Sequence, residues 1–169
     1  MIDSGRIFPI FVLVTSAAVM LTVLLSQYWG GLAPCELCLY ERWPWDAAVV
    51  VSFVAAMAGS RAALPWVAAL LALVFLAGSG LAIYHLGVER HWFAGPAACT
   101  AGAAPTTLEA LKSQLMHQQP VRCDEPAWTL AGVSLAGWNL LGSLAMAAVC
   151  LLVFVRARSG LSSPRARPA

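Results

Sequence analysis

Two cysteines separated by two residues, Cys35 and Cys38, are the most reactive feature of the chain. Pro34 precedes them, and because proline is favoured in the first turn of a helix, the sequence predicts that a helix begins here. Residues three apart share a helix face, so the two thiols would be close enough to bridge or exchange. The unpaired N–H groups and the macrodipole of a helix N-terminus favour a thiolate. We therefore predict a redox-active pair rather than a structural bridge, which would close almost no loop and stabilise little.

Arg42 follows Cys38 by four residues and is predicted to lie on the same helix face, one turn deeper. A guanidinium at that depth is costly unless it has an anionic or polar partner. A Cys38 thiolate, or the carbonyl oxygen of a ligand beside it, would be such a partner. The alternative is that Arg42 extends its charge to the membrane interface. Arg42 is therefore a candidate ligand-binding residue.

The other three cysteines are Cys99 and Cys123 in a polar segment and Cys150 in an apolar run. Disulfide exchange proceeds by thiolate attack through a mixed disulfide, so a mobile Cys99/Cys123 pair beside a fixed Cys35–Cys38 pair would form a two-stage relay. The alternative is a bridge that only staples the loop, and spacing does not give connectivity. No metal is expected, because zinc would normally need a second closely spaced pair. Cys150 is expected to act as a small apolar side chain.

The composition predicts a small membrane protein with one domain. Of 169 residues, 60% are hydrophobic and 11% charged, which excludes a water-soluble globule and a disordered chain. A net charge of +2 is too small to indicate a surface that binds nucleic acid. Four segments are apolar enough to cross a bilayer, at about 7–28, 43–58, 62–84 and 132–155.

The predicted fold class is an all-α membrane protein, a four-transmembrane-helix bundle. Residues 1–158 form its single domain and 159–169 a tail expected to be disordered. The first apolar segment exceeds the core of a typical signal peptide, so we expect an uncleaved anchor. Gly59-Ser60-Arg61 is short enough to make the second and third segments an antiparallel hairpin. One membrane interface is predicted by four clustered aromatic residues: Tyr28, Trp29, Trp43 and Trp45.

The basic residues predict the orientation. Six are dense around the two termini and the short hairpin, namely Arg6, Arg61, Arg156, Arg158, Arg165 and Arg167. The opposite face has four over a much longer stretch: Arg42, Arg90, Lys112 and Arg122. Both termini are therefore expected in the cytoplasm, and loops 29–42 and 85–131 on the outer face. Because the number of predicted spans is even, both loops lie on the same outer face. Cys35, Cys38, Cys99 and Cys123 are therefore expected in an oxidising compartment, where disulfides form and persist.

The second outer loop, 85–131, is predicted to contain a short interfacial helix. Thr106 and Glu109 have capping-box spacing, and Leu108, Leu111 and Leu115 recur at helical intervals. His85 stands at the start of this loop, where it could hydrogen-bond a ligand carbonyl or simply be an interfacial histidine. Asn139, within the last apolar segment, is more typical of interhelical contact than of ligand binding.

These residues together resemble the bacterial disulfide bond formation protein B (DsbB) family. The resemblance covers nearly the whole chain and rests on these stretches: Cys35-Glu36-Leu37-Cys38 with Tyr40-Glu41-Arg42, Tyr84-His85 with Gly87-Val88-Glu89, Gly95-Pro96, the Cys99/Cys123 pair, and Ser134-Leu135-Ala136-Gly137-Trp138-Asn139. It implies an inner-membrane enzyme that reoxidises a periplasmic DsbA-like thioredoxin-fold partner and reduces a membrane quinone, ubiquinone or menaquinone.

The resemblance also implies individual roles. Cys99 would form the mixed disulfide with the partner and Cys123 would resolve it, after which electrons would pass to Cys35 and Cys38. Cys38 would be the thiolate against the quinone ring, with Arg42 beside a quinone oxygen and His85 as a further candidate quinone ligand. Alternatives are an enzyme like the vitamin K epoxide reductases, whose Cys-x-x-Cys usually lies late in the chain, a metal-binding module, or a non-catalytic scaffold with structural disulfides.

Overall fold

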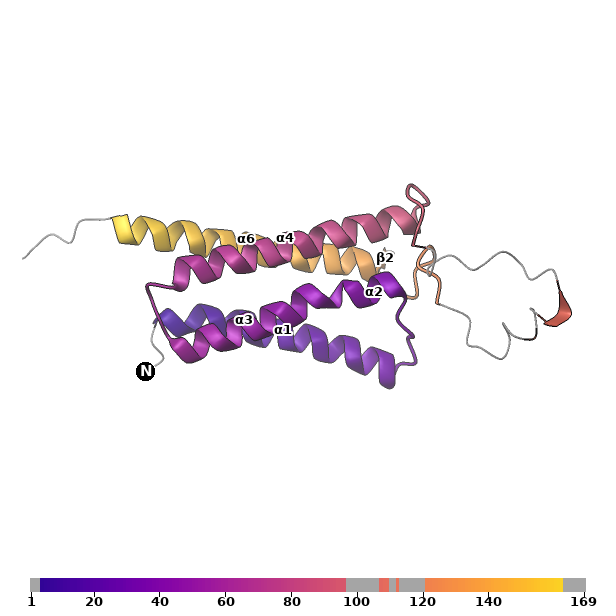
Figure 1. Cartoon of the computed structure of the whole chain (residues 1–169), viewed down its shortest axis with the longest axis horizontal. Helices are drawn as coiled ribbons and strands as arrows, with labels where there is room; N and C mark the ends of the chain where they lie inside the picture. Colours follow the sequence, from indigo (N-terminus) through magenta and orange to yellow (C-terminus); the bar gives the residue numbers. More distant parts are fainter. Residues whose placement is uncertain (1–3, 97–106, 110–111, 113–120, 163–169) are drawn as a thin grey trace, which may run out of the picture.

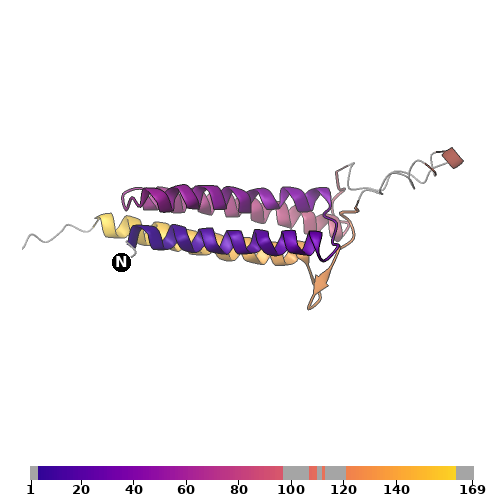
Figure 2. The same ribbon diagram turned by 90° about the horizontal axis from the view of Figure 1, so that it is seen from below.

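The computed structural model describes residues 4–96, 107–109, 112 and 121–162. Four long helices run side by side in this part of the chain: α1 (Ser4–Tyr28), α3 (Arg42–Ala58), α4 (Leu64–Glu89) and α6 (Leu135–Ser162). A short helix, α2 (Glu36–Tyr40), leads into α3 with only Glu41 between them. Helix α1 packs on α3 and α4 packs on α6, while α3 also contacts α4 (Figures 1 and 2).

Three of these helices, α1, α4 and α6, are long and apolar enough to cross a membrane. Helix α3 has 17 residues, at the short end of what a span requires, and the four-span count therefore stays a prediction. Large apolar side chains such as Leu21, Phe53, Leu73 and Leu152 are more than half exposed on the outside of the bundle. That exterior is what a lipid environment favours and what a soluble protein avoids.

The core between the helices is closely packed. Val12 of α1, Leu71 and Phe75 of α4, and Cys150 of α6 are fully buried in it. Trp45 of α3 joins them, with its ring edge-on to Phe75 at 5.1 Å between centroids. Trp45 is therefore buried between the helices, whereas the other three aromatic residues of the predicted interface, Tyr28, Trp29 and Trp43, are exposed. Trp45 turns inward because its indole N–H finds a partner inside the bundle, as described below.

The start of α1, the α3–α4 turn and the end of α6 lie at one end of the bundle, and α2 lies at the other (Figure 1). Gly59 ends α3 with a left-handed backbone, at φ 60°, where a side chain would be strained. A Cβ added there would also lie only 2.5 Å from Nε of Arg6, which packs on the turn from α1. The turn therefore closes the antiparallel α3–α4 hairpin, as the sequence predicts.

At the other end, α6 begins three residues later than predicted, because a two-stranded hairpin precedes it. Strands β1 (Thr129–Leu130) and β2 (Val133–Ser134) pair antiparallel and project beside the bundle (Figure 2). Both turn residues, Ala131 and Gly132, have positive φ, as the tightest hairpin turns require. Ser134 donates to a Glu89 carboxylate oxygen at 2.6 Å and joins the hairpin to the end of α4. The interfacial helix predicted over Thr106–Leu115 falls mostly outside the described residues.

Candidate functional site

Cys35 is the N-cap of α2. Its Sγ accepts a hydrogen bond from the backbone N–H of Cys38 at 3.2 Å, a task that serine, threonine, aspartate or asparagine usually performs. The helix thus begins at Glu36, and Pro34 precedes the cap instead of lying in the first turn. Of the two thiols, Cys35 is therefore the one that accepts a hydrogen bond from a backbone N–H in the first turn of α2.

The Cys35 and Cys38 sulfurs lie 2.6 Å apart, and both residues are free thiols. The hydrogen bond with Cys38 lowers the pKa of Cys35, because an ionised Cys35 sulfur accepts from the Cys38 thiol; burial opposes this effect, and the Cys38 backbone N–H adds to it. The same thiol–thiol hydrogen bond raises the pKa of Cys38, and burial raises it further. The reduced pair therefore loses its first proton from Cys35, whereas the resemblance implies a Cys38 thiolate. The difference arises because an ionised Cys35 would accept hydrogen bonds from both the backbone N–H and the thiol of Cys38.

A titration of the reduced protein tests this assignment. In the Cys38→Ala variant, Cys35 loses its thiol donor, so the pKa of Cys35 should rise compared with that of the intact pair. Thiolate absorbance in the ultraviolet, followed against pH, measures the change. The matched Cys35→Ala variant should shift the remaining Cys38 pKa downward from its raised position. A lower Cys35 pKa after removal of Cys38 would contradict the assignment.

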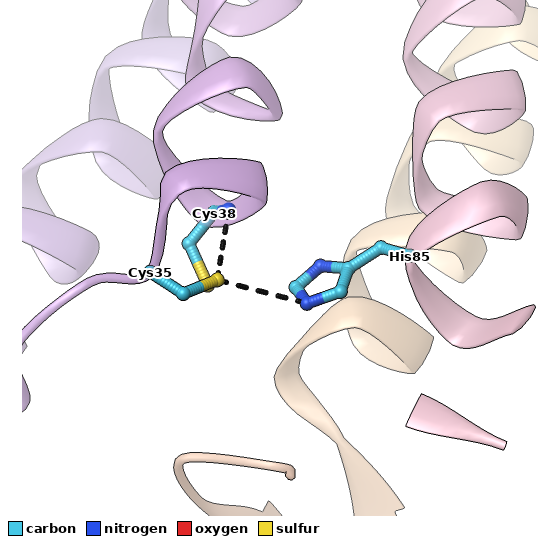
Figure 3. A group of neighbouring side chains, drawn as sticks. All are labelled: Cys35, Cys38 and His85. Carbon is cyan, nitrogen blue, oxygen red and sulfur yellow. Dashed lines mark hydrogen bonds between the residues drawn. The ribbon is translucent and has the colours of Figure 1, made fainter. Parts of the chain in front are cut away.

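His85 lies next to the two thiols, and Glu41 lies next to His85. His85 projects from α4 toward the pair, with Nε2 at 3.7 Å from the Cys35 sulfur (Figure 3). Its Nδ1 lies 3.0 Å from Glu41 Oε1, and the two side chains are only 4% and 9% exposed. A carboxylate can only accept, so the Nδ1–H donates to it and the ring is held with Nε2 toward the sulfur. Sequence reasoning gave Glu41 no role of its own, although it stands in the Tyr40-Glu41-Arg42 stretch that contributes to the resemblance.

A cavity of about 310 Å³ reaches the pair at Cys38. It lies among α1, the α2–α3 segment and α6, and most of its lining is apolar, including Val19, Met20 and Leu135. Cys38, Glu41 and Arg42 contribute its polar wall, opposite Asn139. Its volume is at the small end of the range for ligand pockets. His85, predicted as a ligand of the cofactor, is not among the lining residues, because its ring turns to Cys35 and Glu41 instead.

Two residues that line the cavity, Arg42 and Asn139, each have a buried side-chain donor without a partner. Arg42 donates from Nη1 to Gln27 Oε1 of α1 at 2.8 Å, yet its buried Nε–H has no acceptor. Asn139 accepts from the Trp45 indole N–H at 2.8 Å, which confirms an interhelical role, but its buried Nδ2 has no acceptor either. Buried donors without acceptors cost free energy. The wall is thus suited to a ligand that brings acceptors.

Cys123 lies against the first pair. It is fully buried in a small cluster with Cys35, Leu37 and Val88, and Cys38 packs on the edge of the same cluster. Cys123 is disulfide-bonded, whereas Cys99 lies outside the described residues. Cys150 is buried in the other cluster, at the bundle core, and behaves as the apolar residue that the sequence predicts. The fold therefore brings cysteines from the segments 29–42 and 85–131 into one cluster.

Comparisons with known proteins identify a family of similar chains. The model of the family described as Disulfide bond formation protein DsbB matches residues 5–153. Disulfide bond formation protein B of Stutzerimonas stutzeri is 30% identical over 162 residues, which cover 90% of this chain and 96% of that protein. The protein of the same name from Azoarcus sp. is 32% identical over 159 residues, covering 89% and 95%. Disulfide bond formation protein B 2 of Pseudomonas aeruginosa is 31% identical over 157 residues, covering 88% of each.

Proposed function

Because the chain belongs to the DsbB family of disulfide bond formation proteins, and so is a disulfide-forming oxidoreductase, we propose that it is a quinone-dependent thiol oxidase. It reoxidises a periplasmic thioredoxin-fold protein similar to DsbA and passes the electrons to ubiquinone or menaquinone. In this proposal the chain is a bacterial inner-membrane protein with four spans and cytoplasmic termini. Its redox loops, 29–42 and 85–131, face the periplasm.

One observation carries the proposal: Cys38 lines an apolar cavity together with Arg42 and Asn139, each of which has a buried side-chain donor without an acceptor. A quinone ring is apolar on both faces and has two carbonyl oxygens, which accept hydrogen bonds. Arg42 and Asn139 line the cavity and each has a buried donor without an acceptor, so these residues fit such a ring once their side chains turn toward it. Arg42 and Asn139 would hold it, and Cys38 would contact it. When bound, a quinone supplies a sink for two electrons and two protons.

The relay between the two cysteine pairs follows from the shared cluster. The partner's first thiolate attacks the Cys99–Cys123 bridge, forms a mixed disulfide with Cys99 and releases the Cys123 thiol; the partner's second thiol then displaces Cys99, so that the partner leaves oxidised. The outer pair, now a dithiol, then attacks the Cys35–Cys38 disulfide and leaves it reduced, so that two electrons move inward at each exchange. Packing of Cys123 in one cluster with Cys35 supports this step.

The proton path in this proposal uses His85 and Glu41. Oxidation of the Cys35–Cys38 dithiol releases two protons, and the His85 Nε2 faces the Cys35 sulfur at 3.7 Å. Glu41 contacts Nδ1 of the same ring and also lines the cavity. His85 would accept a proton from Cys35, and Glu41 would balance the imidazolium charge at the cavity wall. His85 and Glu41 would therefore connect Cys35, the thiol that ionises first, to the cavity in which a bound quinone would take up protons.

Turnover of the purified protein tests the proposal. Given a reduced DsbA-like protein, the detergent-solubilised full chain should oxidise it and reduce ubiquinone or menaquinone analogues in a one-to-one ratio. Quinone absorbance and a thiol count of the partner measure the two sides of the reaction. Omitting the partner, or supplying it already oxidised, provides the control. Failure to reduce either quinone with a reduced partner present would refute the proposed function.

A further inference from the structure

The three side chains in Figure 3 form a group that offers more than redox chemistry. The sulfurs of Cys35 and Cys38 and a ring nitrogen of His85 all lie within 4.8 Å of one another. Two thiolates and one imidazole are a set of ligands that Zn²⁺ prefers, and three protein ligands with an open fourth position are typical of accessible zinc sites. Two thiolates would also neutralise a divalent cation, so the buried complex would carry no net charge of its own.

The spacing already approaches that of a tetrahedral site. Zn–S and Zn–N bonds of about 2.3 and 2.0–2.1 Å place a sulfur and a nitrogen about 3.5 Å apart and two sulfurs about 3.8 Å apart. The distance from the Cys35 sulfur to His85 Nε2 is 3.7 Å. The two sulfurs are at 2.6 Å and need to separate by about 1 Å. Cys38 borders the cavity, so its side chain has space to rotate outward.

Glu41 supplies an independent observation that favours a metal. Its carboxylate binds the Nδ1 side of His85 at 3.0 Å, and both side chains are at least nine-tenths buried. Metal-binding histidines commonly donate their second ring N–H to a carboxylate, which fixes the tautomer and increases the basicity of the ligand nitrogen. Here the same arrangement leaves Nε2 free to bind and directs it at the sulfurs.

We propose that the reduced Cys35–Cys38 pair and His85 bind a thiophilic divalent cation such as Zn²⁺, which holds the pair in its dithiolate state. The cation replaces the thiol protons, which are released, and no electron is transferred. Oxidation to a disulfide joins the two sulfurs covalently and removes both thiolate ligands, so metal binding and oxidation exclude each other. The site does not depend on which acceptor or protein partner the enzyme uses.

Cobalt binding to the full chain in detergent tests the proposal. A Cys99→Ser/Cys123→Ser background removes the other thiols that reduction would expose. After reduction and removal of the reductant, Co²⁺ should give one equivalent of thiolate-to-cobalt charge-transfer absorption, which Zn²⁺ then displaces. Oxidation to the disulfide should abolish the absorption. Its absence from the reduced chain, or its persistence in the oxidised chain, would overturn the proposal.

Variants identify the ligands. His85→Ala should abolish tight binding, and Glu41→Gln should weaken it by about 10- to 100-fold. Cys150→Ala, which removes a free cysteine from the bundle core, should leave the spectrum unchanged. Equal affinity in His85→Ala, or loss of absorption in Cys150→Ala, would refute the assigned ligands. In the unsubstituted chain, Zn²⁺ should also slow alkylation of Cys35 and Cys38, as peptide mapping would show; unchanged alkylation rates would count against the site even if a variant failed to fold.

Discussion

The Cys38→Ser variant is expected to lose quinone-dependent oxidation of the partner entirely, falling to the uncatalysed background. Cys38 is the thiol that both touches Cys35, at 2.6 Å between sulfurs, and lines the cavity. A serine hydroxyl retains the shape and the hydrogen bond but forms no disulfide, so the inner pair could neither take electrons from the outer pair nor pass them on. Steady-state quinone reduction with a reduced partner measures the loss.

Cys150→Ala is the matched control, because Cys150 is also a free, buried cysteine but lies in the bundle core. It should keep its turnover. Trapping adds a second measurement: Cys38→Ser should still form a mixed disulfide with the partner, because the outer pair is intact. Substantial turnover by Cys38→Ser would remove the inner pair from the proposed pathway and would leave the outer cysteines as the only redox centre.

The Arg42→Ala variant is expected to raise the apparent KM for quinone by about 10- to 100-fold, with a much smaller change in kcat. The magnitude follows from the roughly 1.5–3 kcal/mol that a hydrogen bond from a charged group contributes, at about 1.4 kcal/mol for each factor of ten. The Arg42 Nε–H is a buried donor without an acceptor in the cavity wall, so a quinone oxygen would complete its hydrogen bonding. Initial rates at a series of quinone concentrations measure the split between KM and kcat.

Arg90→Ala is the control for the loss of a positive charge. Arg90 follows α4 at the same end of the bundle, is exposed, and does not line the cavity. Its removal should leave the quinone KM within about twofold, as expected for a surface charge of little energetic weight. Gln27→Ala should give an intermediate effect, because Gln27 only orients the guanidinium through its 2.8 Å hydrogen bond. A near-normal KM in Arg42→Ala would exclude Arg42 from the binding site.

The metal proposal and the oxidase proposal fail independently. Loss of cobalt absorption in the reduced chain would leave the turnover assay untouched, and absence of turnover would leave the donor set of Cys35, Cys38 and His85 intact. If both hold, zinc should inhibit turnover by trapping the reduced inner pair, and oxidised protein should resist inhibition. The sequence-based expectation of no metal considered only the spacing between cysteines. It did not consider His85, which is 50 residues away from Cys35 in the sequence but close to it in the fold.

Local periodicity determined part of this site without any help from packing. Cys35 and Cys38 meet because they are three residues apart at a helix start, and a helix fixes that neighbourhood whatever surrounds it. Continuous apolar stretches likewise determined α1, α4 and α6, because composition and length alone decide whether a helix can cross a membrane. The turn at Gly59 follows in the same way from a residue that tolerates positive φ.

Tertiary packing decided what the thiols do. Which sulfur ionises first depends on which groups donate hydrogen bonds to it. Glu41 contacts His85 at 3.0 Å only because helix packing brings α4 next to it. The cavity wall joins Arg42 and Asn139 from distant parts of the sequence, and Trp45 turns inward because Asn139 accepts its N–H. Hydrogen-bond partners far apart in sequence are chosen by how the helices pack, and no spacing rule along one chain segment encodes that choice.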